Sequence, residues 1–287
     1  MRRFIPDILV YALAFGAVLV FLFRNAEGVD APEAPPPSAS DRMGAIIAPP
    51  TNVDSSLLVE VPAAASSSGT AFAISPDGVW LTARHVVDGC DEVGLVISPG
   101  TAVKARKVEM ATYSDLAALI TDGAPHPLAL KFDDELRKGQ AVFHIGYPQG
   151  RPGEAASRLM GRERLVARGR YQTEEPVLAW AEVGRTRGLS GTLAGLSGGP
   201  AIDANGNVIG VTIAEQPRRG RIFTSDPTSL ARFLKDIEAE GIVEGRSPGA
   251  ITFDDYGPAA DQLRRDMAVA KVVCVKGQPT EQAPVPR

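Results

Sequence analysis

Between Leu57 and about Asp226, short apolar runs alternate with clusters of Gly, Pro, Asp and Asn. Runs of this length that are rich in β-branched and aromatic residues are typical of strands. The segment VKARKVEMA alternates apolar and polar residues, which indicates a strand with one buried face. The pattern predicts strands at residues 68–75, 79–83, 92–98, 103–111, 115–120, 140–148, 162–171, 176–183, 207–215 and 221–225.

Turn residues separate several of these strands. Asp77-Gly78 and Asn205-Gly206 each stand between two β-prone segments, which is a hairpin signal. Strands and helices do not alternate along this part of the chain, which argues against a doubly wound parallel sheet. The expected fold is therefore all-β, with the many strands forming a pair of packed antiparallel barrels.

One helical pattern follows the strands, at residues 229–241. Its apolar side chains have the i, i+3, i+4, i+7 spacing of a helix with one buried face. Asp226 or Thr228 can cap its start, and Gly241 can cap its end. The apolar positions are Leu230, Phe233, Leu234 and Ile237.

An apolar run stands close to the N-terminus. Ile8 to Phe23 contains sixteen residues without a charge or a proline, and a helix of that length rises about 24 Å. Because Arg2 and Arg3 precede the run, the N-terminus is expected in the cytoplasm. We interpret residues 1–24 as a retained signal anchor, a transmembrane helix of a bacterial inner membrane with the rest of the chain in the periplasm. A cleaved signal peptide is the alternative.

Residues 25–56 are rich in proline and in small polar residues. Such a composition does not pack a core, so we expect a disordered linker. Ile46 and Ile47 are candidates for a small docking point within it.

The remaining chain divides by composition into three parts. The body covers residues 57–243, and a C-terminal extension covers 244–276. Within the extension, the sequence predicts a helix near 259–267 and a short strand at 270–276. The Pro-rich tail, 277–287, is expected to be disordered.

Composition excludes several classes of protein. Thirty Lys and Arg against 34 Asp and Glu give a net charge of −4, which excludes a generally basic nucleic-acid binder. Two cysteines exclude a disulfide-dense scaffold, and three histidines leave little material for a metal cluster. We therefore expect no cofactor, no metal and no nucleic-acid partner.

Three short motifs carry candidate chemistry: LTARHVV at 81–87, YSDLAAL at 113–119 and GLSGGP at 195–200. A serine hydroxyl is a poor nucleophile at neutral pH, and it needs a base and an acid that orients the base. It also needs N–H donors aimed at the oxygen that becomes negative. The glycines of the third motif allow the N–H groups of Gly195 and Ser197 to converge as an oxyanion hole.

The segments SGTAFAISPDGVWLTARHVV, SDLAALI and GLSGGPAID closely resemble trypsin-like serine proteases, above all the bacterial HtrA-type branch. The resemblance implies a double six-stranded β-barrel and serine endopeptidase activity on a protein or peptide substrate. It also implies the roles of the matching residues: His85 as general base, Asp115 as its orienting acid and Ser197 as nucleophile. Outside these motifs, His126 is expected to be a surface loop residue and His144 a structural residue of a strand. The Gly-x-Pro turn at 146–150 is expected to have a structural role.

Two features depart from that branch. Leu196 stands where HtrA-type enzymes usually carry Asn and digestive enzymes carry Asp, so activation through a freed N-terminus is not expected. Only about 45 residues follow Gly241, too few for a PDZ module, which needs about twice that. Because of Leu196, a latent or non-catalytic binding module of protease fold stays an alternative, as does a scaffold of a membrane complex.

The substrate pocket can be placed by counting along the family's motif. Gly191 is expected at its base, with Thr192 beside it, and Val211, Thr212 and Ile213 along a strand that pairs with the substrate. These residues carry no charge, and a buried Arg or Lys of a substrate would need a carboxylate. The sequence therefore predicts cleavage after small or medium apolar residues.

The two cysteines, Cys90 and Cys274, stand far apart in the sequence. In an oxidising compartment a disulfide between them is expected, and it would staple the C-terminal extension to the body. Two unrelated buried thiols are the alternative. Oligomeric state is left open by the sequence.

Overall fold

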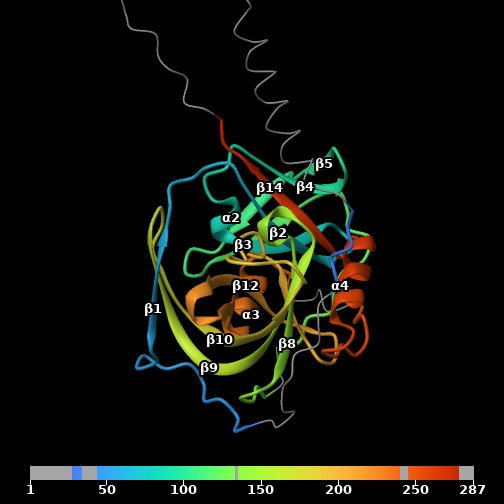
Figure 1. Ribbon diagram of the computed structural model, residues 1–287. Coiled ribbons are helices and arrows are strands. Elements are labelled where there is room, and N and C mark those ends of the chain that lie inside the picture. Colours follow the sequence, from blue (N-terminus) through green and yellow to red (C-terminus); the bar gives the residue numbers. More distant parts are fainter. Residues whose placement is uncertain (1–27, 34–43, 133–134, 240–244, 278–287) are drawn as a thin grey trace, which may run out of the picture.

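The computed structural model describes residues 28–33, 44–132, 135–239 and 245–277, and its strands form two curled sheets (Figure 1). The strands are β1 Ser56–Val61, β2 Ser67–Ser75, β3 Val79–Ala83, β4 Glu92–Ser98, β5 Thr101–Lys104, β6 Lys107–Met110, β7 Leu116–Ile120, β8 Ala141–Gly146, β9 Gly153–Gly169, β10 Thr173–Arg185, β11 Pro200–Asp203, β12 Val208–Gln216, β13 Arg221–Ser225 and β14 Val269–Val275. The helices are α2 Arg84–Val87, α3 Pro227–Asp236 and α4 Tyr256–Arg265, with 3₁₀ turns η1 Pro148–Gly150 and η2 Pro217–Arg219.

Each sheet has seven strands, one more than the expected six. The first sheet has the order β5-β4-β14-β2-β3-β7-β6, and the second has the order β1-β9-β10-β13-β12-β11-β8, closed by a pairing of β8 with β9. The additional strand of the first sheet is β14, which lies between β2 and β4 and crosses the upper sheet in Figure 1. The additional strand of the second sheet is β1, which runs parallel to β9 at its edge. Because β4 pairs only with β14 and β5 among the described strands, β14 is the strand that joins β4 and β5 to the rest of the first sheet.

Two predicted strands differ from the observed ones. The predicted strand 103–111 is two strands, because the chain leaves β4 after Lys104 and pairs with β7 from Lys107 onward. The predicted strand 162–171 is the second half of β9, which begins at Gly153. Its first residues have low β propensity but are fully buried, and burial decides strand formation more than propensity does.

The helices of the structure start and end slightly earlier than predicted. Asp226 caps α3, since its side chain accepts a hydrogen bond from the Thr228 N–H. The helix ends at Asp236 rather than near Gly241, and Glu238 then adopts a positive φ of 56°. The predicted extension helix is α4, and the predicted extension strand is β14.

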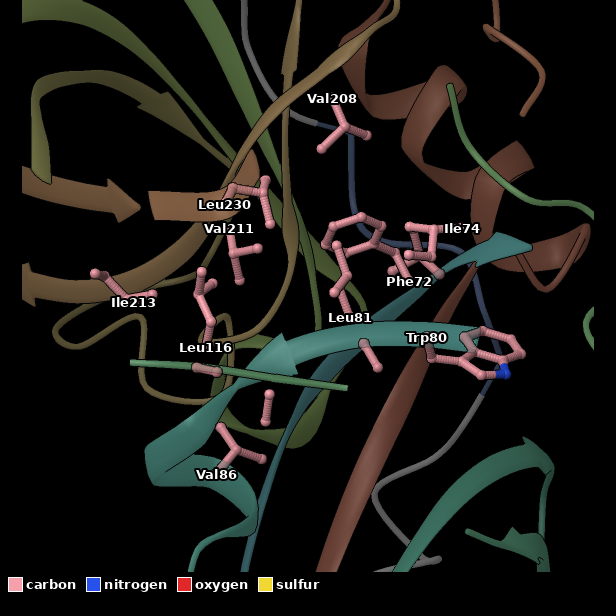
Figure 2. Close-up of a cluster of buried hydrophobic side chains, with 14 of the residues drawn as sticks. Phe72, Ile74, Trp80, Leu81, Val86, Leu116, Val208, Val211, Ile213 and Leu230 are labelled. Atoms are coloured by element: carbon pink, nitrogen blue, oxygen red, sulfur yellow. The ribbon is translucent and has the colours of Figure 1, made fainter. Parts of the chain in front are cut away.

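One hydrophobic cluster joins the two sheets. Phe72 and Leu81 of the first sheet and Val211 of the second belong to it and are fully buried. Figure 2 shows Val211 between Leu116 of β7 and Leu230 of α3. The sheets therefore share one core, so the loops at their junction are held at a fixed separation.

A second cluster lies inside the closed sheet. It includes Trp180, Leu193 and Leu196, and Ile47 also belongs to it. The backbone N–H of Ile47 donates to the Leu136 carbonyl over 2.9 Å, so the expected docking point exists here, in a stretch that we expected to be disordered.

Residues 28–33 contact the C-terminal extension. The guanidinium of Arg264 donates to the Val29 carbonyl over 2.7 Å, and the Ala31 N–H donates to Asp261 over 2.8 Å. Parts of the Pro-rich stretch are thus bound to the body. The predicted transmembrane run and the tail from 278 onward lie outside the described residues, and no helix among those that are described is long and apolar enough to cross a membrane.

A disulfide joins Cys90 to Cys274, which confirms the predicted pairing. Their Cα atoms are 5.5 Å apart, and the bond ties β14 to the turn after α2. Backbone pairing of Cys274 with Ser67 and Val93 places β14 within the first sheet. The strand of the C-terminal extension is therefore part of the first sheet rather than an appendage.

Replacing both cysteines with alanine is expected to lower the free energy of unfolding by up to about 5 kcal/mol, because the bond joins residues 184 positions apart. Urea unfolding monitored by tryptophan fluorescence measures this difference. Reduced wild-type protein provides the control and is expected to match the double variant. Equal unfolding midpoints for oxidised wild type and double variant would contradict the prediction.

Candidate active site

The three predicted residues meet in one cleft between the sheets. A cavity of about 340 Å³ is lined by His85, Asp115 and Ser197, and by Gly195. His85 lies in the short helix α2 after β3, Asp115 directly precedes β7, and Ser197 lies in the loop before β11. Each is positioned by the end of a buried strand, so the shared core fixes their separation.

His85 and Asp115 form a close pair. The Nδ1 atom of His85 lies 2.6 Å from Oδ2 of Asp115, and the backbone N–H of His85 donates to Oδ1 over 2.8 Å. Burial lowers the pKa of His85, but the charge and the hydrogen bond of Asp115 outweigh it, so the pKa is raised above its usual 6.5. The pair fixes the ring and leaves Nε2 as the nitrogen that is not bound to Asp115.

Tyr171 is a partner of Asp115 that the sequence analysis missed. Its hydroxyl donates to Oδ1 of Asp115 over 2.8 Å. The guanidinium of Arg84 lies 4.0 Å from the centre of its ring, and neighbouring Arg170 donates to the His85 carbonyl. Arg170 and Tyr171 come from the turn between β9 and β10, which reaches from the second sheet to the first.

Glu175 is a second missed partner. It is 2% exposed, and its Oε1 accepts the backbone N–H of Asp115 over 2.6 Å. Burial, followed by the nearby charge of Asp115, raises the pKa of Glu175 well above its ordinary value. Burial and the neighbouring Asp115 charge therefore disfavour a second negative charge on Glu175, while its oxygen supports the Asp115 backbone.

The loop before Ser197 is held by close backbone contacts. Thr70 donates its N–H to the Ser197 carbonyl over 2.9 Å and its hydroxyl to the Gly195 carbonyl over 2.7 Å. Gly198 has a φ of 88°, and a Cβ atom there would lie 2.1 Å from the Thr70 oxygen. Glycine is therefore required at this position, and the main chain at Ser197 is tied to β2.

Leu196 is 1% exposed and packs in the second hydrophobic cluster, as does Leu193. An apolar side chain therefore anchors the loop at the position directly before Ser197. Burial of such a side chain contributes about 1.5–3 kcal/mol, so the departure at Leu196 fixes the loop by packing.

The predicted pocket residues divide into three groups. Thr212 lines a small cavity of about 20 Å³ beside Ser197, and Ile213 lines the main cleft. Val211 points into the shared core instead. Gly191 and Thr192 are exposed and line neither of these two cavities. Arg185 donates to the Gly191 carbonyl over 2.9 Å.

The small cavity is mostly apolar, and a carboxylate stands at its edge. Its lining residues are Leu193, Ala194, Leu196, Ser197, Thr212, Ala214, Glu215 and Ile222. Both carboxylate oxygens of Glu215 accept the Leu193 N–H, at 2.8 and 2.9 Å, and one accepts the Thr192 hydroxyl. The sequence analysis predicted no carboxylate in the pocket. The Glu215 carboxylate is present at its edge, but it is hydrogen-bonded to Thr192 and Leu193 of the loop.

The remaining histidines have structural partners. His144 is fully buried between the hydroxyls of Thr212 and Ser157, and burial lowers its pKa to about 3. Nδ1 of His126 lies 2.6 Å from the Asp266 carbonyl oxygen. No group of side chains with the composition of a metal site occurs within the described ranges.

Comparisons with known proteins agree with this geometry. The family profile described as trypsin-like peptidase domain matches residues 69–211. A probable periplasmic serine endoprotease, DegP-like, of Halomonas elongata is 31% identical over 71% of this chain and 37% of its own length. A protein of the same description from Pseudomonas savastanoi is 31% identical over 70% of this chain and 40% of its own length.

Among solved structures, an inactive mutant form of Rv3671c from M. tuberculosis is 26% identical, with a TM-score of 0.49, over 60% of this chain and 82% of that one. This chain spans less than half the length of the two curated relatives. The family match covers the segment that holds His85, Asp115 and Ser197. The chain belongs to the family of trypsin-like serine endopeptidases.

Proposed function

We propose that this protein is a serine endopeptidase in which His85, Asp115 and Ser197 act as a catalytic triad. The observation that carries the proposal is the His85–Asp115 pair, 2.6 Å apart and facing the same cleft as Ser197. In this mechanism Nε2 of His85 takes the proton of the Ser197 hydroxyl as it attacks the substrate carbonyl. This transfer requires a hydrogen bond between the two side chains, which is expected to form when substrate binds.

The oxyanion that forms in this reaction needs two N–H donors, and we assign them to Gly195 and Ser197. The carbonyl groups of both residues are held by Thr70, which leaves the loop little freedom to turn. Protonated His85 then donates to the leaving amine, and Asp115 stabilises the imidazolium charge. A water molecule, activated by His85 in the same way, then attacks the acyl-enzyme and releases the acyl group from Ser197.

The substrate preference follows from the pocket. The cavity beside Ser197 is lined mainly by apolar side chains, which supports a preference for small or medium apolar residues before the cut bond. Glu215 is bonded to the loop and is not free to pair with a substrate Arg or Lys. A peptide-library profile measures the preference, and dominant cleavage after Arg or Lys would contradict it.

The place of action that we propose is outside the cytoplasm. The relatives' descriptions name the periplasm, and the Cys90–Cys274 disulfide requires an oxidising compartment. The apolar run Ile8–Phe23 would anchor the protein in the inner membrane as a single-pass helix. Carbonate extraction of membranes from the bacterial source tests this: release of the intact chain into the soluble fraction would contradict anchoring.

Fluorophosphonate labelling of the purified full chain tests the proposed activity. Labelling is expected in the wild type and is expected to vanish in Ser197→Ala, because only an activated serine reacts. Unlabelled wild type would favour the alternative of a latent or non-catalytic binding module.

The pH dependence of kcat/KM follows from the raised pKa of His85. Only the neutral ring can take the serine proton, so activity is expected to fall as pH falls through this pKa, at a value above 6.5. Steady-state hydrolysis between pH 5 and about 9 measures the profile, with tryptophan fluorescence confirming that the protein stays folded. Half-maximal activity well below 6.5 would contradict the role of His85.

Replacing Tyr171 with phenylalanine is expected to lower kcat/KM about tenfold, since a hydrogen bond to a charged group is worth roughly 1.5–3 kcal/mol. The ring and its contact with Arg84 remain, so the fold is kept. Without the hydroxyl, the Asp115 carboxylate interacts more strongly with protonated His85, so the pH profile is expected to move to higher pH. An unchanged rate and an unchanged profile would show that the hydroxyl is not needed.

A further inference from the structure

The turn η1 stands beneath the loop that carries the oxyanion donors. Its central residue, Gln149, has a φ of 53° and a ψ of 26°, a left-handed conformation that side chains other than glycine rarely adopt. Such a conformation costs free energy and persists only where surrounding contacts hold it. The hydrogen bonds that Gln149 donates all end on the loop directly before Gly195.

Gln149 binds three carbonyl groups of the neighbouring loop. Its side-chain Nε2 donates to the Ser190 oxygen over 2.7 Å and to the Thr192 oxygen over 2.8 Å. Its backbone N–H donates to the Ala194 oxygen over 2.5 Å. This loop has no regular secondary structure, so its carbonyl groups lack the partners that a neighbouring strand would provide. The hydrogen bonds from Gln149 take their place.

The bond to Ala194 sets the direction of the Gly195 N–H. A trans peptide points its C=O and N–H groups to opposite sides. Because the Ala194 carbonyl points to Gln149, the Gly195 N–H points away from η1. If this peptide turned over, a carbonyl oxygen would face the developing negative charge in place of a donor.

A buried lysine supports the turn from the other side. Lys271 is 3% exposed, and its Nζ donates to the Gly150 oxygen over 3.0 Å. Lys271 belongs to β14 and lies opposite Thr70, whose hydroxyl holds the Gly195 carbonyl. The strand β14 thus contacts both η1, through Lys271, and Thr70, and these two hold the loop.

We infer that Gln149 is a positioning residue for the oxyanion hole, and that Lys271 of β14 supports it; this rests on the proposed endopeptidase function. The C-terminal extension lies outside residues 69–211, the part that matches the family profile. The oxyanion hole of this protein therefore depends on a segment that the peptidase domain profile does not include.

Gln149→Gly in the full chain is the main test, since glycine keeps the left-handed backbone and loses the side-chain bonds. We expect kcat to fall about 10- to 100-fold with KM within about threefold, because oxyanion donors act mainly in the transition state. Gln149→Glu has nearly the same shape but places carboxylate oxygens toward carbonyls, and it is expected to lose as much. Lys271→Met is expected to change kcat in the same direction.

A second measurement separates positioning from a merely structural role. A peptide boronate forms a tetrahedral adduct with Ser197 that occupies the oxyanion hole, whereas the product peptide does not. The Gln149→Gly variant is expected to lose about 10- to 100-fold in boronate affinity and to bind product peptide as the wild type does. Gln262→Ala, on the exposed face of α4, is the matched control and is expected to change neither.

The outcomes are distinguishable. Equal loss of boronate and product affinity, or wild-type kcat in both Gln149 variants, would overturn the inference while leaving the proposed function intact. A wild type that reacts with neither fluorophosphonate nor boronate would overturn the proposed function and this inference with it.

Discussion

Replacing His85 with alanine is expected to lower kcat/KM by about 10⁴- to 10⁶-fold. In serine peptidases the nucleophile and its base act as a unit, so loss of the base costs nearly as much as loss of the whole triad. The His85 backbone N–H still donates to Asp115 in this variant, and its side chain is partly exposed, so the fold is expected to persist. Steady-state hydrolysis of an apolar peptide substrate measures the loss.

His126→Ala is the matched control for this variant. His126 is exposed, its Nδ1 lies 2.6 Å from the Asp266 carbonyl oxygen, and it does not line the cleft. It is expected to keep wild-type kcat/KM. A His85→Ala variant that retains a tenth of the wild-type activity would exclude His85 as the base.

The residues of the cleft that the sequence identified all belong to local motifs. His85, Asp115 and Ser197 each follow or precede a recognisable apolar strand, so a short stretch of sequence marks them. The strands themselves were predictable for the same reason, since alternation and turn residues are local signals. The strand 270–276 was predicted as an element, and the disulfide indicated that it joins the body.

What the sequence did not indicate depends on long-range packing. Tyr171 and Glu175 reach Asp115 only because the β9–β10 hairpin crosses to the other sheet, and no motif surrounds either residue. The sequence likewise predicts that 270–276 is a strand but does not indicate that it pairs with β2 and β4. The hydrogen bond from Arg185 to the Gly191 carbonyl is another contact that no motif marks.

Asp115→Asn is expected to lower kcat/KM about 10⁴-fold at neutral pH, because it forces the wrong tautomer of His85. Oδ1 of Asp115 receives two donors, the His85 backbone N–H and the Tyr171 hydroxyl, each over 2.8 Å. An amide in this place must therefore put its oxygen at the Oδ1 position and its NH₂ at the Oδ2 position. The NH₂ group then faces His85 Nδ1, which must accept, so the ring proton moves to Nε2.

With its proton on Nε2, His85 cannot take the proton of Ser197. The argument depends on Tyr171, so the double variant with Tyr171→Phe tests it by a mutant cycle. Once the base is in the wrong tautomer, losing the Tyr171 hydroxyl is expected to cost less than about twofold, compared with about tenfold in the wild type. Additive losses would show that Tyr171 acts on substrate or fold rather than through Asp115. Thermal unfolding of the single and double variants provides the control, and it is expected to show a folded protein in each, since the isosteric amide keeps the backbone N–H of His85 bonded.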